Sequence, residues 1–344
     1  MKNYAVTIGI PVYNVEKYIR LTMDSALAQT FDDIEFLVID DCGTDSSIDI
    51  VREYQQTHPR GNDIRIIRQP GNRGIGNARN RIIDETRSPY LFFLDADDKV
   101  KTSAIELLYD VLKQHDAQIA FGSYERIEDY GGEIRKSTYQ YPQLSFEKEE
   151  TFATWAYRQY NGIQATTWNC LISVELLRKH QLRYKEINYW EDFIFMMDLP
   201  TYITRAVLVS DITYTYYCHT NSLSRFQSRD CIAKSEIEET ISAIENVKSH
   251  SDRIMTKDYF PQRMLKVMMT DFYIICTILR NHKVITPPFS NRELRDIMRS
   301  PLSLMTILSF KTSLIKNLVL YVLGILPPSM SVVVIKLLGR KYIQ

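Results

Sequence analysis

Apolar and polar positions along the first hundred residues follow strand and helix patterns in alternation, joined by short connections. Short apolar runs predict buried strands, and the segments between them place apolar side chains on one helix face. This order predicts an α/β fold whose mostly parallel sheet is flanked by helices. We expect strands near 5–10, 34–39, 64–67 and 90–94, and helices over 19–27, from 44 onward and over 78–83.

The same patterns divide the remainder of the chain into two parts. From 229 to 344 the apolar positions recur mainly at helical spacing. We therefore expect an α/β domain over 1–228 and a helical region over 229–344. Within the first domain we expect a helix in the region 102–124 that carries Ile105, Leu108 and Leu112, followed by a strand over 118–122. We also expect a polar loop or hairpin over 125–150 with a turn at Gly131-Gly132, a helix near 149–160 and a strand over 212–219.

The composition limits the function classes. Hydrophobic residues make up 45% and charged residues 24% of the 344, which is typical of a globular protein. The 42 basic and 42 acidic residues cancel, so no global charge favours nucleic-acid binding. Five cysteines without a C-x-x-C pair indicate neither a zinc site nor a disulfide framework, and hence a reducing compartment. The first strand begins a few residues from Met1, which predicts no signal peptide and a cytoplasmic N-terminus.

An acidic cluster follows the apolar strand near 90–94. Asp95, Asp97 and Asp98 lie within four positions, and their carboxylates repel one another at a cost on the order of a few kcal/mol unless positive charge offsets it. Hard divalent cations such as Mg2+ or Mn2+ prefer carboxylate oxygens. These residues therefore predict a metal site, with a solvated acidic turn as the alternative.

Three further turns follow predicted strands, and ligands of open α/β sheets bind at such carboxyl ends. Tyr13 leaves the first strand and is able to stack on a flat ring, although packing is the other interpretation. In the turn over 40–45, which follows the second strand, a carboxylate is able to accept a hydrogen bond from a pyrimidine ring N–H, whereas Asp45 is explained as a helix cap. Arg79 follows the glycine-rich turn over 71–76 and would neutralise a diphosphate. That turn matches neither a dinucleotide fingerprint nor a P-loop.

Taken in order, these motifs resemble family 2 glycosyltransferases with the GT-A fold. They are Ile-Pro-Val-Tyr-Asn at 10–14, Ser-Ala-Leu-Ala-Gln-Thr at 25–30, Val-Ile-Asp-Asp at 38–41, Asn-Arg-Gly at 72–74, Ala-Arg-Asn at 78–80 and Phe-Leu-Asp-Ala-Asp-Asp at 93–98. The resemblance implies an inverting hexosyltransferase that uses a nucleotide-sugar donor, usually a UDP-sugar, with Mn2+ or Mg2+. It also assigns 1–100 to a nucleotide-binding half and 101–228 to an acceptor half.

The resemblance implies roles for individual residues of the donor site. Pro11, Tyr13 and Asp41 would hold the nucleoside, with Asp41 on the uracil, and Arg79 would approach the diphosphate. Cys42-Gly43 departs from the Gly-Ser that the family more often has, which alters a loop without abolishing binding.

The acidic cluster corresponds to the D-x-D motif of the family, formed here by Asp95 and Asp97. Asp97 or Asp98 would coordinate the metal, and Asp95 would contact sugar or ribose. Independently of any family, a metal that bridges diphosphate oxygens stabilises the charge that grows on this leaving group.

A direct displacement also needs a base for the acceptor hydroxyl. Asp192 resembles the aspartate of the Glu-Asp motif of the family, which is the base, and Glu191 would orient the loop or the acceptor. The structural alternative is that both carboxylates favour the positive N-terminal end of a helix. His219 would approach the metal or pyrophosphate, or be structural. Cys170 replaces the lysine that is common in the Trp-Asn-Lys-Leu segment of the family, which argues against a lysine-dependent contact.

Two apolar segments over 314–326 and 332–338, separated by Pro327-Pro328, lie near the end of the sequence with several Lys and Arg around them. Each is shorter than the roughly 20 residues that span a bilayer. They fit either helices packed on the catalytic domain or an interfacial anchor. Because a lipid-linked saccharide acceptor would lie at the membrane, the resemblance favours peripheral attachment at the inner face of the cell membrane and a role in surface polysaccharide synthesis.

Three other protein classes compete with this interpretation. A haloacid-dehalogenase-type phosphohydrolase would use Asp95 as nucleophile, but it expects Thr or Val where Lys99 stands. A nucleotidyltransferase would need a glycine-rich phosphate loop with Arg and Lys near the first strand, which the chain lacks. A non-catalytic scaffold of a synthase complex would keep the fold, although the acidic cluster together with Asp192 argues against it.

Overall fold

The computed structural model describes residues 2–129, 133–158, 163–187, 190–219 and 230–343. Contacts divide the chain into two compact units. The first comprises Met1–Phe152 and Gln164–Ser222, and the second comprises Ala153–Ile163 and Leu223–Gln344. A short segment from the middle of the chain thus groups with the helices that follow residue 222.

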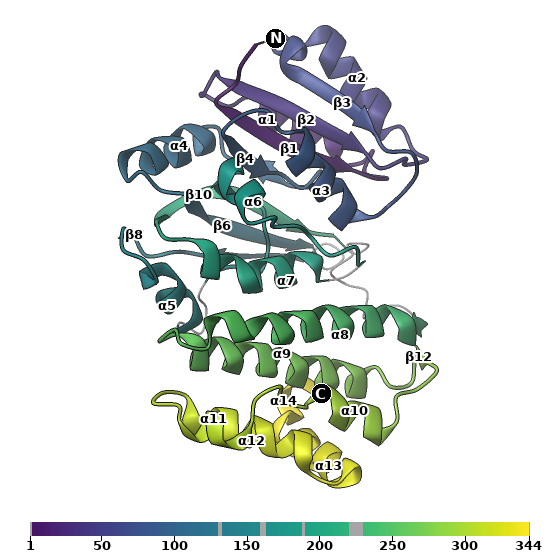
Figure 1. Cartoon of the computed structure of the whole chain (residues 1–344). Helices are drawn as coiled ribbons and strands as arrows, with labels where there is room; N and C mark the ends of the chain where they lie inside the picture. The colour runs from purple at the N-terminus through teal and green to yellow at the C-terminus, as the bar shows by residue number, and fades with distance from the viewer. Residues whose placement is uncertain (1, 130–132, 159–162, 188–189, 220–229, 344) are drawn as a thin grey trace. The chain divides into compact units, whose positions relative to one another are not determined.

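One large sheet forms the centre of the first unit (Figure 1). Its strands are β1 (Val6–Val12), β2 (Ile34–Asp40), β3 (Ile64–Arg68), β4 (Tyr90–Phe93), β5 (Lys99–Val100), β6 (Ile119–Asp129), β7 (Ile134–Tyr139), β8 (Leu144–Phe146), β9 (Cys170–Ser173) and β10 (Ala206–Cys218). The helices around it are α1 (Ile19–Leu27), α2 (Ser47–Thr57), α3 (Ile75–Glu85), α4 (Ala104–Gln114), α6 (Val174–Lys179) and α7 (Glu191–Asp198), while α5 (Thr151–Arg158) crosses the boundary between the units.

The sheet is mostly parallel, with the strand order β3-β2-β1-β4-β9-β6-β10-β5 in the described part of the chain. β1 pairs in parallel with β2 and β4, and β2 pairs in parallel with β3. β9 runs antiparallel between β4 and β6, whereas β6 and β10 are parallel. The carboxyl ends of β1 to β4 therefore meet at one edge. This confirms the predicted α/β class and places the turns singled out above together.

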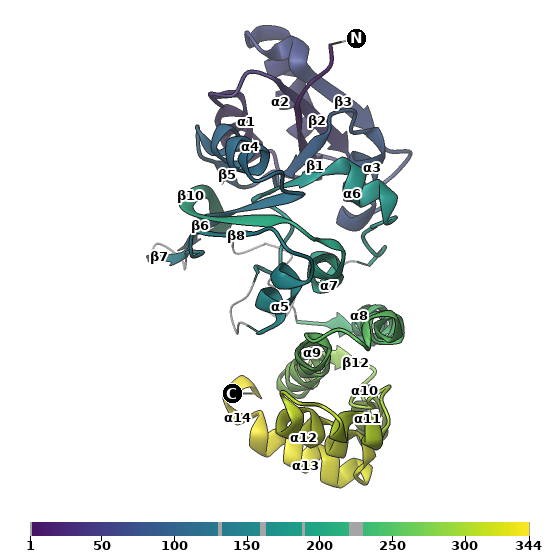
Figure 2. The same ribbon diagram turned by 60° about the vertical axis from the view of Figure 1, so that its left-hand side comes forward.

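Different helices cover the two faces of this sheet. On one face, alternate strand residues such as Ile8 and Phe36 share a core cluster with apolar residues of α1, α2 and α4. On the other face, Gly9 lies so close to α3 that an added Cβ would stand 2.4 Å from the Ile82 side chain. Figure 2 shows α1 and α4 on one side of the sheet and α3 and α6 on the other. β1 and β2 are buried at every position, as expected for strands covered on both sides.

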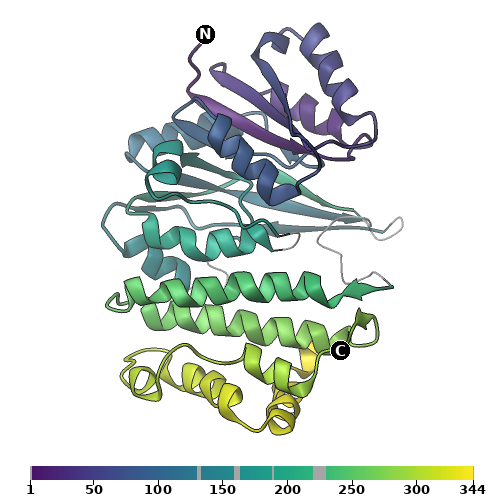
Figure 3. The same cartoon turned by 45° about the vertical axis from the view of Figure 1, so that its right-hand side comes forward.

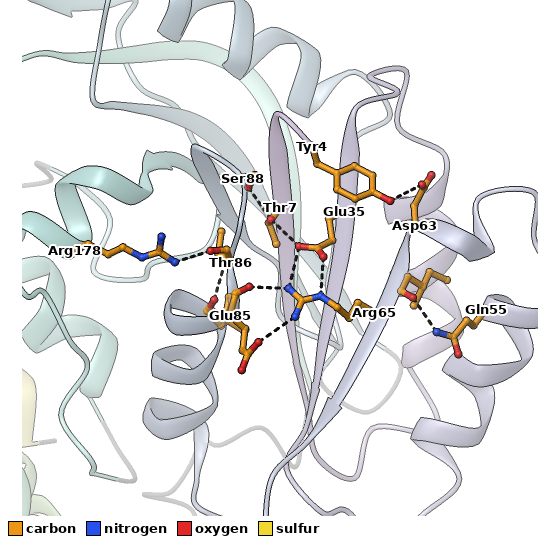
Figure 4. A network of polar contacts seen from close by, with 12 residues as sticks. Tyr4, Thr7, Glu35, Gln55, Asp63, Arg65, Glu85, Thr86, Ser88 and Arg178 are labelled. Atoms are coloured by element: carbon orange, nitrogen blue, oxygen red, sulfur yellow. Dashed lines mark hydrogen bonds and ion pairs between the residues drawn. The ribbon is translucent and has the colours of Figure 1, made fainter. Parts of the chain in front are cut away.

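A polar network closes the amino-terminal ends of these strands (Figure 4). Arg65 in β3 donates from Nε and Nη2 to the two oxygens of Glu35 in β2, at 2.7 and 3.2 Å, and from Nη1 to Glu85 in α3 at 3.1 Å. Thr7 in β1 donates from Oγ1 to Glu35 at 3.2 Å. Because Glu35 is buried, its charge is tolerated only with such donors.

We expect Glu35→Ala to lower the free energy of unfolding by about 1–3 kcal/mol, because Arg65 loses a bidentate partner and Thr7 loses an acceptor. Urea unfolding followed by circular dichroism measures the change. Glu53→Ala is the matched control, since Glu53 pairs with Arg20 at the surface and both side chains are more than half exposed. The control should leave the urea midpoint nearly unchanged. Equal midpoints for the two variants would contradict a stabilising role of the network.

The second unit is helical, in line with the spacing of its apolar residues. Its long helices α8 (Lys234–Ser249) and α9 (Phe260–Arg280) run side by side (Figure 3). They are followed by α10 (Asn291–Ile297), α11 (Leu304–Leu308), α12 (Leu314–Ile325), α13 (Pro328–Leu338) and α14 (Arg340–Ile343), and the short strands β11 (Ile232–Ala233) and β12 (Ile285–Thr286) pair in parallel. Within the described ranges, no helix combines the length and apolarity needed to cross a membrane.

Two strands are longer than the apolar pattern predicts. β6 continues through polar residues to Asp129 and pairs antiparallel with β7, which agrees with a hairpin, while the expected turn at Gly131-Gly132 lies outside the described residues. β10 begins at Ala206 and not at 212. β7 is exposed along most of its length, so backbone pairing defines it where no apolar pattern does.

Candidate functional site

The carboxyl edge of the sheet carries most of the residues singled out from the sequence. β1, β2 and β4 are contiguous there, and Tyr13, Asp41 and Asp95 follow within two positions of their ends. The topology thus gathers turns that are far apart in the chain. Pro11 is buried within β1, whereas Tyr13 is 45% exposed. An exposed aromatic ring at this edge is available for stacking.

Asp41 holds the glycine-rich turn that precedes α3. Its Oδ1 accepts hydrogen bonds from the Gln69 amide at 2.7 Å and the Arg73 N–H at 2.9 Å, and its Oδ2 accepts one from the Gly74 N–H at 2.9 Å. Gly74 has φ 81° and ψ 168°, a region essentially restricted to glycine. Burial raises the pKa of Asp41, although the three donors oppose this shift. One lone-pair site on Oδ2 remains for a ligand N–H.

Asp98 ties the acidic loop to β10. It is fully buried, its Oδ2 accepts a hydrogen bond from the Tyr214 hydroxyl and its Oδ1 accepts one from the Tyr217 N–H, both at 2.8 Å. The Tyr214 oxygen in turn accepts the Asp95 N–H at 3.2 Å. Burial raises the pKa of Asp98 well above its usual value, and the charges of Asp97 and Asp95 add to this. Both oxygens serve the fold, which argues against the metal-binding role expected for Asp98 as the alternative to Asp97.

Asp97 is the carboxylate of this loop that remains available. In the described part of the chain no other residue donates a hydrogen bond to its side-chain oxygens, while its backbone carbonyl accepts one from the His219 ring. Burial, followed by the charge of Asp95, raises the pKa of Asp97 to about 7, and a nearby cation would lower it again. The described residues contain no ready group of three or more metal-binding side chains. Mg2+ at phosphate sites is commonly held by one or two carboxylates plus the substrate phosphates, and Asp97 with Asp95 fits that arrangement.

Arg79 joins the acidic loop to the start of α7. Its Nη2 donates to Asp95 Oδ1 at 2.9 Å and its Nη1 donates to Glu191 Oε1 at 2.7 Å. The side chain is buried, with its guanidinium 5.6 Å from the centroid of the Tyr184 ring. Although burial opposes the shift, Asp95 and Glu191 raise the pKa of Arg79. An approach of Arg79 to a diphosphate stays a prediction. In the structure both its Nη atoms pair with carboxylates and so offset part of the negative charge for which the sequence predicts a metal.

Two contacts of α3 hold the chain ahead of α7, and the sequence pattern does not predict them. Asn80 donates from Nδ2 to the Tyr184 carbonyl at 3.0 Å, and its Oδ1 accepts the Tyr184 N–H at 2.8 Å. A Cβ on Gly76 would stand 2.4 Å from the Lys185 carbonyl, so the helix and this segment are in close contact. A signal was present in the sequence, because Asn80 follows Arg79 in one of the quoted motifs.

Glu191 and Asp192 open α7, as the sequence predicts, and Trp190 precedes them in a left-handed conformation with φ 67°. Glu191 is buried, whereas Asp192 is half-buried and its Oδ1 accepts the Phe193 N–H at 2.7 Å. Burial raises the pKa of both carboxyl groups, and the charge of Arg79 opposes the shift. A raised carboxyl pKa at such a position is suited to accepting a proton.

His219 lies at the end of β10 in a stacked environment. Its ring stacks on Tyr18 with 3.8 Å between centroids, and burial lowers its pKa. Among the described residues, its buried Nε2 has no hydrogen-bond partner. Residues 220–229, which follow it closely, lie outside the described residues.

The Trp-Asn segment, Trp168 and Asn169, packs against β10 of the sheet. Trp168 stacks on Tyr214 at 4.6 Å between centroids, and Asn169, fully buried, accepts the Thr213 hydroxyl at 2.6 Å. Cys170 is buried in β9, which raises the pKa of its thiol to about 12 and keeps it protonated.

Comparison with known protein families decides the class. The model of Glycosyl transferase family 2 matches residues 7–181, a span that runs from β1 through β9 and α6 and includes the acidic loop. The chain belongs to glycosyl transferase family 2. This membership confirms the resemblance noted from the motifs and excludes the phosphohydrolase and nucleotidyltransferase alternatives.

This family 2 chain is similar to several known proteins and solved structures. Glycosyltransferase GlyA of Streptococcus pneumoniae is 30% identical over 227 residues, which cover 64% of this chain and 31% of GlyA. This chain therefore spans about a third of that relative. S. aureus TarS 1–349, in complex with UDP-GlcNAc, has a TM-score of 0.57 at 16% identity and covers 93% of this chain and 90% of its own.

A second solved structure shares the fold. Mannosyltransferase PcManGT from Pyrobaculum calidifontis, in complex with GDP-Man and Mn2+, has a TM-score of 0.50 at 15% identity, with 99% of this chain and 82% of that chain covered. At these identities the likeness concerns the fold alone, and it supports a GT-A-like α/β fold for this family 2 chain.

Proposed function

We propose that this chain is an inverting, metal-dependent glycosyltransferase that moves a hexose from a UDP-sugar to a saccharide or lipid-linked saccharide. The observation that carries the proposal is the contact of Arg79 with both Asp95 and Glu191, which joins the acidic loop to the helix that presents Asp192. These contacts support a single site that combines a donor motif with a base from a distant segment. The UDP-GlcNAc bound to TarS and the GDP-Man bound to PcManGT support a nucleotide-sugar donor.

The donor occupies the edge formed by residues 1–100. Tyr13 stacks on the uracil, Pro11 shapes the strand end beneath it, and Asp41 accepts the ring N–H at its remaining lone pair. Asp97, with Asp95 beside it, would hold Mn2+ or Mg2+ together with the diphosphate. When bound, this metal stabilises the negative charge that grows on the diphosphate leaving group.

The acceptor lies on the side of residues 101–228. Asp192 takes the proton of the acceptor hydroxyl as that oxygen attacks the anomeric carbon, which gives inversion in one displacement. Arg79 is a positioning residue in this scheme, since it fixes Glu191 at the start of α7. Asp98 positions the acidic loop. A contact of His219 with pyrophosphate stays a prediction, supported by its unpaired buried Nε2.

A screen of nucleotide sugars tests this function. Purified protein is titrated with UDP- and GDP-hexoses in Mn2+, in Mg2+ and in EDTA, and release of nucleoside diphosphate is followed with and without oligosaccharide acceptors. We expect one UDP-hexose to bind with metal, to bind at least about tenfold more weakly in EDTA, and to release UDP faster when an acceptor is present. If no nucleotide sugar binds and none releases nucleoside diphosphate, the non-catalytic scaffold is favoured. A role in surface polysaccharide synthesis at the inner face of the membrane is part of the proposal.

A further inference from the structure

The outer helices of the second unit leave an apolar surface uncovered. Sixteen large apolar side chains are exposed among the described residues, and eleven of them fall between 304 and 338. Ile315 is 77% exposed and Met305 is 75% exposed. We call this set the α11–α13 surface; it consists of Leu304, Met305, Leu308, Ile315, Val319, Val322, Ile325, Met330, Val333, Leu337 and Leu338. Such a concentration of exposed apolar side chains marks an interaction site.

The surface arises because α12 and α13 each carry apolar side chains both on the face that packs within the unit and on the exposed face. In α12, Ile315, Val319, Val322 and Ile325 follow one another at intervals of three or four residues and so share one helix face. The opposite side of the same helix buries Leu320 and Leu323 within the unit. A helix that packs on a core by one face needs polar residues on the other. The exposed apolar face of α12 therefore indicates that a partner covers it.

Figures 1 and 2 show α11, α12 and α13 together in one layer of the second unit, with α9 between this layer and α8. Contacts of α12 with α9, α11 and α13 agree with that layering. With 12 and 11 residues, α12 and α13 are about half as long as a helix that spans a bilayer. They are suited to lying along an interface.

Charge identifies the kind of partner. From 297 to 344 the sequence has no Asp or Glu, although the whole chain has equal numbers of acidic and basic residues. The same stretch contains six basic residues, all exposed: Arg299, Lys311, Lys316, Lys336, Arg340 and Lys341. A second copy of this chain would bring the same positive charge against it, which disfavours self-association. An anionic lipid surface complements both the apolar side chains and the basic ones.

We propose that the α11–α13 surface docks on an anionic lipid bilayer. The exposed apolar side chains enter the boundary between headgroups and acyl chains, and the basic side chains contact headgroup phosphates. The inference concerns a surface of the second unit and does not depend on transferase activity.

Vesicle co-sedimentation of the full chain tests the proposal. We expect binding to vesicles of phosphatidylcholine with phosphatidylglycerol, weaker binding to phosphatidylcholine alone, and a loss of the difference at high salt. The double variant I315E/V319E should bind at least about tenfold more weakly. Met255→Glu is the matched control and should bind like the wild type, because Met255 is 42% exposed in the same unit but outside the surface. Lys311→Gln with Lys316→Gln should remove most of the preference for anionic lipid.

Circular dichroism and nucleotide-sugar binding show whether each variant is folded. Equal binding of the wild type and I315E/V319E to anionic vesicles would overturn the proposal, as would absence of wild-type binding. If sedimentation velocity shows a dimer that I315E/V319E dissociates, while vesicles bind neither protein, the surface is an interface between copies and not a lipid site. If a variant loses vesicle binding but still binds the donor, the lipid proposal is tested without affecting the proposed transferase function. The failure of one proposal can therefore be distinguished from the failure of the other.

Discussion

Asp192→Asn is expected to lower kcat for glycosyl transfer by about 100-fold or more, while the Kd for the nucleotide sugar changes by less than about threefold. Asparagine keeps the shape of the side chain and can still accept the Phe193 N–H, which Asp192 Oδ1 accepts at 2.7 Å. It cannot take a proton from the acceptor hydroxyl. The loss therefore falls on the chemical step and not on donor binding.

The alternative role of Asp192 makes a different prediction. If this carboxylate only complements the positive end of α7, its removal would cost about 0.3–1 kcal/mol of stability and leave transfer by the folded enzyme nearly unchanged. Asp198→Asn, at the opposite end of the same helix, is the matched control and should retain wild-type kcat. Isothermal titration with the donor and a UDP-release assay with acceptor separate the two effects. Equal kcat for Asp192→Asn and the control would refute the base assignment.

Asp97→Asn is expected to abolish most metal-supported donor binding, with a rise in donor Kd of about tenfold or more and a comparable loss of kcat/KM. The Asp97 carboxylate is half-buried and its pKa is raised to about 7 by burial and by Asp95, so a bound cation would relieve an existing repulsion. An amide lowers the negative charge at the metal position without a large change in volume.

The measurement is a donor titration in Mn2+ and in EDTA, for the wild type, Asp97→Asn and Asp110→Asn. Asp110 is exposed on α4 and serves as the matched control. The wild type and the control should bind donor more tightly in Mn2+ than in EDTA, and Asp97→Asn should show little difference between the two conditions. A full metal effect in Asp97→Asn would transfer the role to another carboxylate. Equal loss of donor binding in Asp97→Asn and Asp192→Asn would contradict the division of labour between these residues.

Local patterns were enough to predict the fold class and the edge of the sheet that carries the site. The apolar runs that became β1, β2 and β4 are almost entirely buried, and a short apolar run bounded by turn residues can be recognised in the sequence without knowledge of its neighbours in space. Asp41 and Asp95 follow such runs directly, so their place at the carboxyl edge follows from the parallel order. The hairpin strand β7 was less visible, since its side chains are mostly exposed and only backbone pairing defines it.

The distinction between Asp97 and Asp98 required contacts across the chain. Both aspartates belong to one short acidic run, and nothing local separates them. The Asp98 carboxylate accepts hydrogen bonds from Tyr214 and Tyr217, which lie 116 and 119 positions away, and these contacts favour a structural role for it. The pairing of Arg79 with Glu191 could not be predicted from local sequence for the same reason, because the two residues are 112 positions apart.

The sequence pattern also could not predict which side chains of the helices α12 and α13 are buried. An apolar stripe has the same spacing whether it faces a core or a lipid surface, so the segments over 314–326 and 332–338 fitted both interpretations. Packing decides which side chains are covered: Leu320 and Leu323 turn inward, and Ile315 and Val319 remain outside. Hydrophobic spacing and strand-end chemistry are properties of neighbouring residues, whereas charge compensation and exposure depend on which distant segments the fold brings together.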